Sequence, residues 1–398
     1  MRKTKTGEKE QSRIAKNNKG WAAFIYSDEL DKFPYPPEHP FNTIRAKKVR
    51  EIISSMGLLS GNGRTEAAPE PVNRIVLKKF HSARYLHALK EVSEGKSNTE
   101  ALSMGIGTPD CPVFKGLYEG AVLAAGGTLV GAKLLLSGEA NVAFNPSGGF
   151  HHAGPQRASG FCYINDMAIA CLVLAESQKR VLYLDVDVHH GDGVAYAFYD
   201  RRDVMTISLH QDPRTLFPGT GFADETGSGE GKGFCVNIPL PIGTFDQAYM
   251  KAFTSLVLPL IEAFNPDVFV FELGADALAG DPLAQLQLTN NVYVEIIQHL
   301  LSFNKPILAT GGGGYNIANT VRAWALAWCV FAGVDVSGTS QGDGVPNKDA
   351  VGIVADGIRV KLRDQIPAVS NRQSSIVEPA VDAVIELVKK SVFPFHGL

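Results

Sequence analysis

Residues 180–193 combine a hydrophobic run with acidic and histidine side chains that are spaced two apart. The apolar part, 181–184, is typical of a strand that is buried on both faces. Side chains two positions apart in a strand point to the same side, so Asp185, Asp187 and His189 would share one face at its carboxyl end. Two carboxylates and an imidazole would repel and desolvate one another there without a cation. A polar strand end in solvent is the alternative, and a metal site needs further ligands.

Titratable residues also follow three other expected strands. The residues that follow them are, in chain order, His151 and His152 after strand 141–144, Asp276 after strand 267–273, and Tyr315 after strand 306–310. In open parallel α/β sheets, ligands bind beyond the carboxyl ends of the strands. We therefore expect all four loops to meet at one rim of a sheet.

Asp187, His189 and Asp276 supply three metal ligands and leave a fourth position for water or substrate. That arrangement is typical of a catalytic zinc site rather than a structural one. Because two of the three ligands are carboxylates, Fe(II), Co(II) or Mn(II) would also fit. The sequence leaves the identity of the metal open.

The remaining rim residues suit proton transfer. Neutral His151 or His152 beside an activated water can act as a general base, and Asp185 and Asp192 are candidate partners that would fix the histidine tautomers. Tyr315 follows four glycines and could donate to a developing oxyanion. No Lys-Ser/Thr follows these glycines, so a phosphate-binding P-loop is excluded. Together the residues predict hydrolysis of a carbonyl compound.

Strands and helices are expected to alternate from residue 142 to residue 328. This predicts an α/β fold with a single doubly wound, mainly parallel sheet and helices on both of its faces. Residues 1–20 carry a net charge of +5, against −3 for the whole chain, and are expected to form a disordered basic tail before one domain over 21–398. We expect a loop over 60–73 and a last helix near 380–390.

Composition predicts a soluble cytoplasmic protein, with 45% hydrophobic and 20% charged residues. The five cysteines are scattered, without zinc-finger or redox spacing, which suits a reducing compartment. No signal peptide is recognisable, and the apolar stretch 323–334 is too short to span a bilayer. We expect no membrane or direct nucleic-acid partner, and an oligomer is possible.

Several longer motifs extend over most of the chain. They are GGFHHA at 148–153, SGFCYIND at 159–166, LDVDVHHGDG at 184–193, SLH at 208–210, FPGTG at 217–221, GADALAGDPL at 274–283 and GGGGYN at 311–316. On these motifs the chain resembles the histone deacetylase family, in the broad sense that includes bacterial acetoin-utilisation proteins and acetylpolyamine amidohydrolases. The resemblance begins near residue 21 and runs to the last helix.

The resemblance implies an arginase/deacetylase-like fold and a zinc-dependent amidohydrolase that removes acetyl or other acyl groups from the ε-amine of lysine. Zn(II) would be bound by Asp187, His189 and Asp276. The other implied catalytic residues are the tandem histidines His151 and His152, their respective partners Asp185 and Asp192, and the transition-state tyrosine Tyr315.

The resemblance also implies residues around the substrate. Gly160, Phe161 and Phe217 would line a narrow channel for the acyl-lysine stem, and Asp110 would hold the substrate backbone at the rim. Arg45 would lie in an internal cavity that handles released acetate. A structural K⁺ or Na⁺ site is implied near residues that act largely through their carbonyls, namely Asp185, Asp187, His189, Ser208 and Leu209.

Two departures from the family pattern concern partners and substrate. Pro282 replaces a basic residue that is frequent in corepressor-bound nuclear members, which argues against a chromatin complex. Leu283 is neutral where some polyamine-selective relatives carry an acid, which favours acyl-lysine substrates over cationic polyamines. A counter-charge from Asp110 or from an oligomer partner keeps an acetylpolyamine or small acyl-amide hydrolase open as the alternative.

Two more distant alternatives are less compatible with the sequence. A dinuclear manganese ureohydrolase of arginase type needs aspartates where this chain has Gly191 and Leu278, so a second metal would lack ligands. A catalytically silent acyl-lysine-binding protein is the other, and the intact set of ligands, histidines and tyrosine argues against it.

Overall fold

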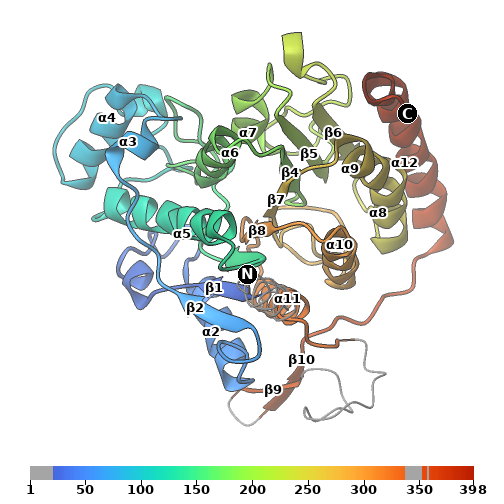
Figure 1. Ribbon diagram of the computed structural model, residues 1–398, viewed down its shortest axis with the longest axis horizontal. Helices are drawn as coiled ribbons and strands as arrows, with labels where there is room; N and C mark the ends of the chain where they lie inside the picture. Colours follow the sequence, from blue (N-terminus) through green and yellow to red (C-terminus); the bar gives the residue numbers. More distant parts are fainter. Residues whose placement is uncertain (1–20, 337–351, 356–357) are drawn as a thin grey trace, which may run out of the picture.

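The computed structural model describes residues 21–336, 352–355 and 358–398 (Figure 1). The predicted basic tail, residues 1–20, lies outside the described residues. Eight strands form one parallel sheet in the order β2-β1-β3-β8-β7-β4-β5-β6. The strands are β1 (Ala22–Ile25), β2 (Arg64–Ala67), β3 (Val142–Asn145), β4 (Val181–Asp185), β5 (Val204–Gln211), β6 (Cys235–Leu240), β7 (Val268–Glu272) and β8 (Ile307–Thr310). The predicted parallel α/β sheet is confirmed.

Helices cover both faces of the sheet, with α3 to α7 on one side and α2 and α8 to α12 on the other (Figure 1). They are α2 (Ile44–Ser55), α3 (Arg74–Leu77), α4 (Ala83–Ser93), α5 (Leu117–Ser137), α6 (Asp166–Glu176), α7 (Asp192–Ala197), α8 (Asp246–Ala252), α9 (Leu258–Phe264), α10 (Asn291–Ser302), α11 (Ile317–Phe331) and α12 (Asn371–Val392). A π-helical turn, Phe253–Val257, joins α8 to α9. A separate antiparallel pair consists of β9 (Gly352–Ala355) and β10 (Ile358–Lys361).

The two faces of the sheet contribute to two separate hydrophobic cores. In β4, Val181 and Tyr183 pack with α4 to α7, while Leu182 and Leu184 pack with the helices of the other face. Neighbouring strand residues point in opposite directions, so a strand covered on both faces must be apolar at every position. This explains the continuous apolar run at 181–184 that the sequence shows.

Helix α5 packs unusually close to its neighbours. It has 21 residues and a mean hydropathy of 1.5, so by length and composition it could cross a membrane. In the fold it is a core helix, because a Cβ atom at Gly126 would lie 1.8 Å from the carbonyl oxygen of Glu70, and one at Gly131 would lie 2.6 Å from Leu308 Cδ1. Glycine is therefore required where the helix backbone meets other chain segments.

Three expectations about elements were wrong. Residues 60–73 contain strand β2, whose polar sequence RTEA lacks an alternating pattern because the strand lies at the sheet edge. The last helix begins at Asn371, well before residue 380, and continues through Pro379. Strand β4 ends at Asp185, so the expectation that Asp187 and His189 share a face of this strand with Asp185 is wrong.

We predict that Gly126→Ala lowers the free energy of unfolding by about 1–3 kcal/mol, because the added methyl group must push apart two backbone segments. This cost exceeds the gain of up to about 1 kcal/mol from better helix propensity. Lys133→Ala, on the exposed side of the same helix, is the control and should change stability by less than about 0.5 kcal/mol. Urea denaturation of the three proteins measures the difference, and equal midpoints would contradict the close packing of α5.

Candidate metal centre and active site

Four neighbouring strands in the middle of the sheet carry the loops of the candidate site. In the order β3-β8-β7-β4, they precede the tandem histidines, Tyr315, Asp276 and the Asp187–His189 segment, respectively. The chain places β4 three positions away from β3 in the sheet and later fills the two positions between them with β7 and β8. Sequence segments that are more than 120 residues apart thus deliver their side chains to one rim, as predicted.

The three predicted metal ligands lie together and are buried. Oxygen and nitrogen atoms of Asp187, His189 and Asp276 lie within 4.8 Å of one another. The Nδ1 atom of His189 is 3.0 Å from Asp187 Oδ1 and 3.0 Å from Asp276 Oδ2. Two buried carboxylates this close to one imidazole are the donor set of a divalent cation, so the residues fit the implied zinc ion.

Glycines make room for these ligands. A Cβ atom at Gly274 would lie 2.1 Å from Asp187 Oδ2, and one at Gly313 would lie 1.9 Å from Asp276 Oδ2. The Gly313 N–H donates to Asp187 Oδ2 over 2.7 Å, and the Val188 N–H donates to Asp276 Oδ1 over 2.9 Å. The four-glycine run after β8 therefore allows the backbone to support the ligand carboxylates directly.

Asp185 faces a different partner from the two ligands that follow it. Because β4 ends at Asp185, Asp187 and His189 lie in the succeeding loop, and the strand alternation that we expected for all three does not apply. Asp185 Oδ2 lies 2.9 Å from His151 Nδ1, and its Oδ1 accepts from the Asp187 N–H. Asp192 Oδ1 lies 2.7 Å from His152 Nδ1. Both predicted His–Asp pairs are present.

The tandem histidines share a proton. Their Nε2 atoms are 3.0 Å apart, so one ring donates and the other accepts. Burial opposes charge on His151, but the carboxylates of Glu272 and Asp185 outweigh it and raise the pKa of His151 well above 6.5. Burial and the charge of His151 lower the pKa of His152 to about 4, although Asp192 opposes this shift. His151 is therefore the cation and His152 the neutral acceptor.

Residues that the sequence did not single out hold the tandem-histidine loop. Asp166 accepts hydrogen bonds from the N–H groups of Gly149 and Phe150, just before the histidines. The side-chain amide of Asn165 donates to the carbonyl oxygens of His151 and Ala153. Both Asn165 and Asp166 belong to the SGFCYIND motif. Asn165 caps the N-terminus of helix α6, and Asp166 is the first residue of that helix.

His81 supports the same region without taking part in chemistry. Its Nε2 accepts from the backbone N–H of Asn165 over 2.9 Å. Burial lowers the pKa of His81 to about 3, so it remains neutral.

Tyr315 is fixed through its backbone. The Tyr315 N–H donates to Asp281 Oδ2 over 2.7 Å, and Arg45 donates to the carbonyl oxygen of Gly314 over 2.8 Å. Burial, reinforced by the negative charges of Asp276 and Asp187, raises the pKa of Tyr315 well above 10. The phenol therefore keeps its proton and can donate a hydrogen bond beside the metal ligands. Asp281, part of the GADALAGDPL motif, was missed as an anchor.

Aromatic rings surround the entrance to the site. Phe161 packs edge-on to Tyr315 with ring centroids 5.7 Å apart, and Phe217 packs against His152 at 5.0 Å and His189 at 6.3 Å. Phe217 is 45% exposed, so the part of the entrance that Phe217 forms is in contact with solvent. Phe161 thus lies beside Tyr315, and Phe217 lies beside His152 and His189.

The other predicted substrate residues are partly engaged within the protein. Asp110 Oδ2 accepts from the Gly160 N–H over 2.8 Å, and the Gly160 carbonyl accepts a weak hydrogen bond from Cys162 Sγ. Both Asp110 and Gly160 are half-buried. Leu283 is also half-buried, and its N–H donates to Asp281. Asp110 therefore fixes the loop that carries Phe161.

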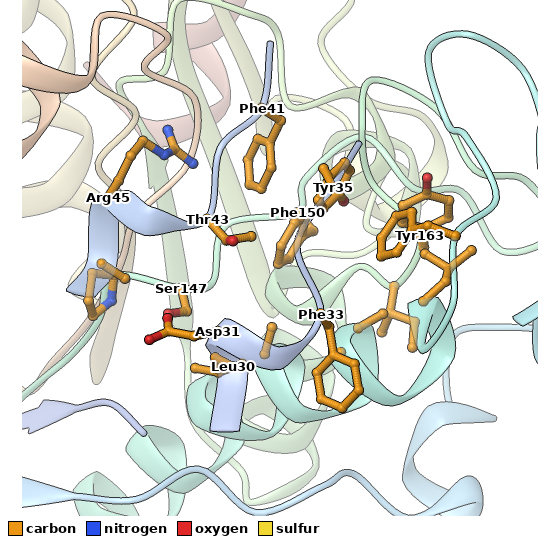
Figure 2. A pocket seen from close by; sticks show the side chains of 18 of the residues that line it. Leu30, Asp31, Phe33, Tyr35, Phe41, Thr43, Arg45, Ser147, Phe150 and Tyr163 are labelled. Carbon is orange, nitrogen blue, oxygen red and sulfur yellow. The ribbon is translucent and has the colours of Figure 1, made fainter. Parts of the chain in front are cut away.

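Arg45 lies at one end of an internal pocket. Figure 2 shows Tyr35, Phe41, Phe150 and Tyr163 along the pocket, with Arg45 beside them. The Arg45 guanidinium lies 4.5 Å from the centroid of the Phe41 ring and is buried. A buried cation in a mainly apolar pocket can attract a small anion, as the predicted cavity requires.

The residues of the predicted monovalent-cation site adjoin one another without forming a visible cage of side chains. Asp185 in β4 lies opposite Ser208 in the neighbouring strand β5, and Leu209 is the next residue of β5. The Ser208 hydroxyl is hydrogen-bonded to His210 Nδ1 over 2.8 Å. The Ser208 hydroxyl is therefore engaged with His210, and a lone pair of its oxygen, like the neighbouring carbonyl oxygens, remains for an ion.

A second group of possible ligands shares Asp187 with the first. It consists of His151, Asp187 and Glu272, again within 4.8 Å. The arginase-type positions contribute nothing to it, because Leu278 is buried in the hydrophobic core and a Cβ atom at Gly191 would lie 2.3 Å from Asp185 Oδ2. Glu272 was not foreseen, since it lies at the end of an otherwise apolar strand.

Comparison with known proteins agrees with this geometry. Residues 39–331 match the histone deacetylase domain. The acetoin utilization protein AcuC of Bacillus subtilis is 40% identical over 322 residues, which cover 79% of this chain and 83% of AcuC. The histone deacetylase clr6 of Schizosaccharomyces pombe is 36% identical over 317 residues, covering 79% of this chain and 77% of clr6.

A solved structure supports the fold as well. The crystal structure of a histone deacetylase homologue from Aquifex aeolicus superposes with a TM-score of 0.79 at 31% identity, and the match covers 93% of this chain and 100% of that one. Fold and sequence agree over the matched region. The chain therefore belongs to the histone deacetylase family and is a zinc-dependent deacetylase, a hydrolase.

Proposed function

We propose that this enzyme removes acetyl or other acyl groups from the ε-amine of lysine in proteins or peptides. One observation carries the proposal: the buried trio Asp187, His189 and Asp276 adjoins both the tandem histidines and the Tyr315 phenol. These groups together can activate water, accept a proton and stabilise an oxyanion. Relatives named as histone deacetylases support a lysine substrate.

The proposed cofactor is one Zn(II) ion held by Asp187, His189 and Asp276, for which Fe(II) or Co(II) could substitute. When bound, such an ion supplies a Lewis acid for the amide carbonyl and lowers the pKa of a water molecule. We also propose a structural K⁺ or Na⁺ held largely by carbonyl oxygens. Its residues would be Asp185, Asp187, His189, Ser208 and Leu209.

The histidines are assigned the proton transfers. Neutral His152, with its Nδ1 held by Asp192, accepts a proton from the attacking water on Nε2 when that atom is released from the 3.0 Å contact with His151 Nε2. Cationic His151 remains beside it, held by Asp185. After the carbon–nitrogen bond breaks, the histidine pair returns one proton to the leaving amine, so the pair ends the cycle as it began. Tyr315 donates its hydroxyl hydrogen bond to the oxyanion that forms at the amide carbonyl.

The entrance suits a neutral, slender substrate. Acylation removes the charge of a lysine side chain and leaves an apolar four-carbon stem, which Phe161 and Phe217 can contact on two sides. Gly160 offers a backbone carbonyl in the same wall. Asp110 would hold the substrate backbone at the rim, and neutral Leu283 adds apolar surface. Arg45 would attract the carboxylate product into the pocket behind the site.

An acetylpolyamine or small acyl-amide hydrolase is the alternative, because it needs the same chemistry. A polyamine would bring additional positive charges to the entrance. Leu283 offers them no counter-charge, and the Asp110 carboxylate already accepts the Gly160 N–H. These observations favour acyl-lysine. We further propose that the enzyme is cytoplasmic, consists of one catalytic domain over 21–398, and binds neither membranes nor nucleic acid directly.

Tyr315→Phe should lower kcat on an acetyl-lysine peptide by about 100-fold, because it removes one preorganised donor to the oxyanion. KM should change little, since this donor acts mainly in the transition state. Tyr118→Phe on helix α5 is the matched control and should keep full activity. A kcat within about threefold of the unmodified enzyme would exclude the oxyanion role.

Acetyl-lysine peptide should have a higher kcat/KM than acetylputrescine or acetylspermidine, because neutral Leu283 offers the polyamine ammonium groups no counter-charge. Steady-state kinetics on the same enzyme preparation compare these substrates together with longer acyl-lysine peptides. A preference of tenfold or more for either polyamine would replace the proposed substrate class with the alternative.

A further inference from the structure

The turn that carries Phe161 has a backbone conformation that a large side chain disfavours. Residues 159–162 form a tight hairpin turn, in which the N–H groups of Ser159 and Cys162 each donate to the carbonyl oxygen of the other residue. The two central residues, Gly160 and Phe161, have φ angles of +53° and +66°. A hairpin turn with positive φ at both central positions favours glycine and asparagine, so Phe161 is strained there. Such strain persists only where surrounding groups hold the backbone in place.

This turn lies directly against the catalytic groups. A Cβ atom at Gly160 would lie 2.2 Å from His152 Cδ2, so the backbone at this position leaves no room for a side chain above the imidazole. The ring of Phe161 packs edge-on to Tyr315 with centroids 5.7 Å apart. A shift of the turn would therefore change the space that is open to a substrate stem between these rings.

The Pro-rich segment 33–41 contacts the turn through two side chains. The Tyr35 hydroxyl donates to the Phe161 carbonyl oxygen over 2.7 Å. The His39 ring packs edge-on to the Phe161 ring with centroids 4.6 Å apart. Figure 2 shows Tyr35 beside Phe41, and their ring centroids are 4.8 Å apart. Four prolines restrict the backbone of this segment, so it is a firm support for the two side chains.

We propose that Tyr35 is a positioning residue that fixes the turn 159–162 and thereby sets the width of the entrance on its Phe161 side. The hydrogen bond from Tyr35 holds the carbonyl group of the strained residue itself, and its loss would leave that oxygen without this donor. The consequence for substrate binding rests on the acyl-lysine function proposed above, whereas the support of the turn does not.

A role in the internal pocket is the competing explanation, because Tyr35 also lines that pocket together with Arg45. A tyrosine hydroxyl has a single hydrogen, and in Tyr35 this hydrogen is donated to the Phe161 carbonyl oxygen. It is therefore not available to an anion in the pocket. This geometry favours the support of the turn over the binding of a product.

Tyr35→Phe removes only the hydroxyl group and tests the proposal in the intact enzyme. KM for an acetyl-lysine peptide should rise by about fivefold, with kcat within about twofold, because Phe161 contacts the stem in the ground state and in the transition state alike. A lower kcat with unchanged KM would place Tyr35 in the chemical step and overturn the proposal. Weaker inhibition by acetate with unchanged KM would overturn it in favour of the pocket.

Tyr85→Phe is the matched control. The Tyr85 hydroxyl also donates over 2.7 Å to a carbonyl oxygen of the same segment, that of Tyr163, which lies just beyond the turn. The two substitutions should lower the free energy of unfolding in urea by similar amounts, but only Tyr35→Phe should raise KM. An equal rise of KM in both variants would reflect a general loss of stability and overturn the proposal.

A double substitution tests whether the effect acts through the Phe161 ring. In Phe161→Ala this ring is missing, so the addition of Tyr35→Phe should change KM by less than about twofold. Independent effects would instead multiply, and a further rise of about fivefold in the double variant would overturn the proposal.

Hydrogen exchange tests the support of the turn independently of activity. The amide hydrogens of Gly160 and Cys162 should exchange about tenfold faster in Tyr35→Phe than in the unmodified protein, and less than about threefold faster in Tyr85→Phe, by mass spectrometry with residue resolution. Unchanged exchange in Tyr35→Phe would overturn the proposal. Faster exchange in this variant, in an enzyme that prefers acetylpolyamines to acetyl-lysine, would reject the proposed substrate and still support the role of Tyr35.

Discussion

The structure depends on the compensation of negative charge that is buried at the centre of the sheet. Asp185, Asp187, Glu272 and Asp276 are all buried within one cluster, and His151 and His189 are the only imidazoles among the described residues that contact them. Removing several carboxylates from water is costly unless each is paired or binds a cation. An imidazolium at His151 and a metal ion bound beside His189 would provide this compensation on either side of Asp187.

The topology of the sheet makes this concentration of charge possible. Strands β3, β8, β7 and β4 are neighbours, so their carboxyl ends present four loops to the same volume. Glycines at 274 and 313 let the backbone approach the ligand carboxylates and donate to them. The helices on both faces keep water away from the strands, which strengthens each electrostatic contact at their ends.

Local patterns were sufficient to predict the parallel sheet and the trio Asp187, His189 and Asp276, because apolar strands followed by titratable residues are visible in the sequence. Which aspartate pairs with which histidine was implied by the family resemblance. The supporting residues could not be predicted in this way. Glu272 interrupts an apolar strand only at its last position, and Asp281 and Asp166 act through backbone N–H groups of loops distant in sequence. Strand β2 was missed because pairing with β1, rather than its own composition, makes it a strand.

The central claim is that a single ion, held by Asp187, His189 and Asp276, supports activity. Titration of the chelator-treated protein with Zn(II), with metal content and acetyl-lysine hydrolysis measured together, tests it most directly. The account predicts that activity rises in proportion to zinc and reaches its maximum at one equivalent per chain, and that Asp276→Asn neither retains this equivalent nor recovers activity. Maximal activity at two equivalents, or without any bound metal, would contradict it.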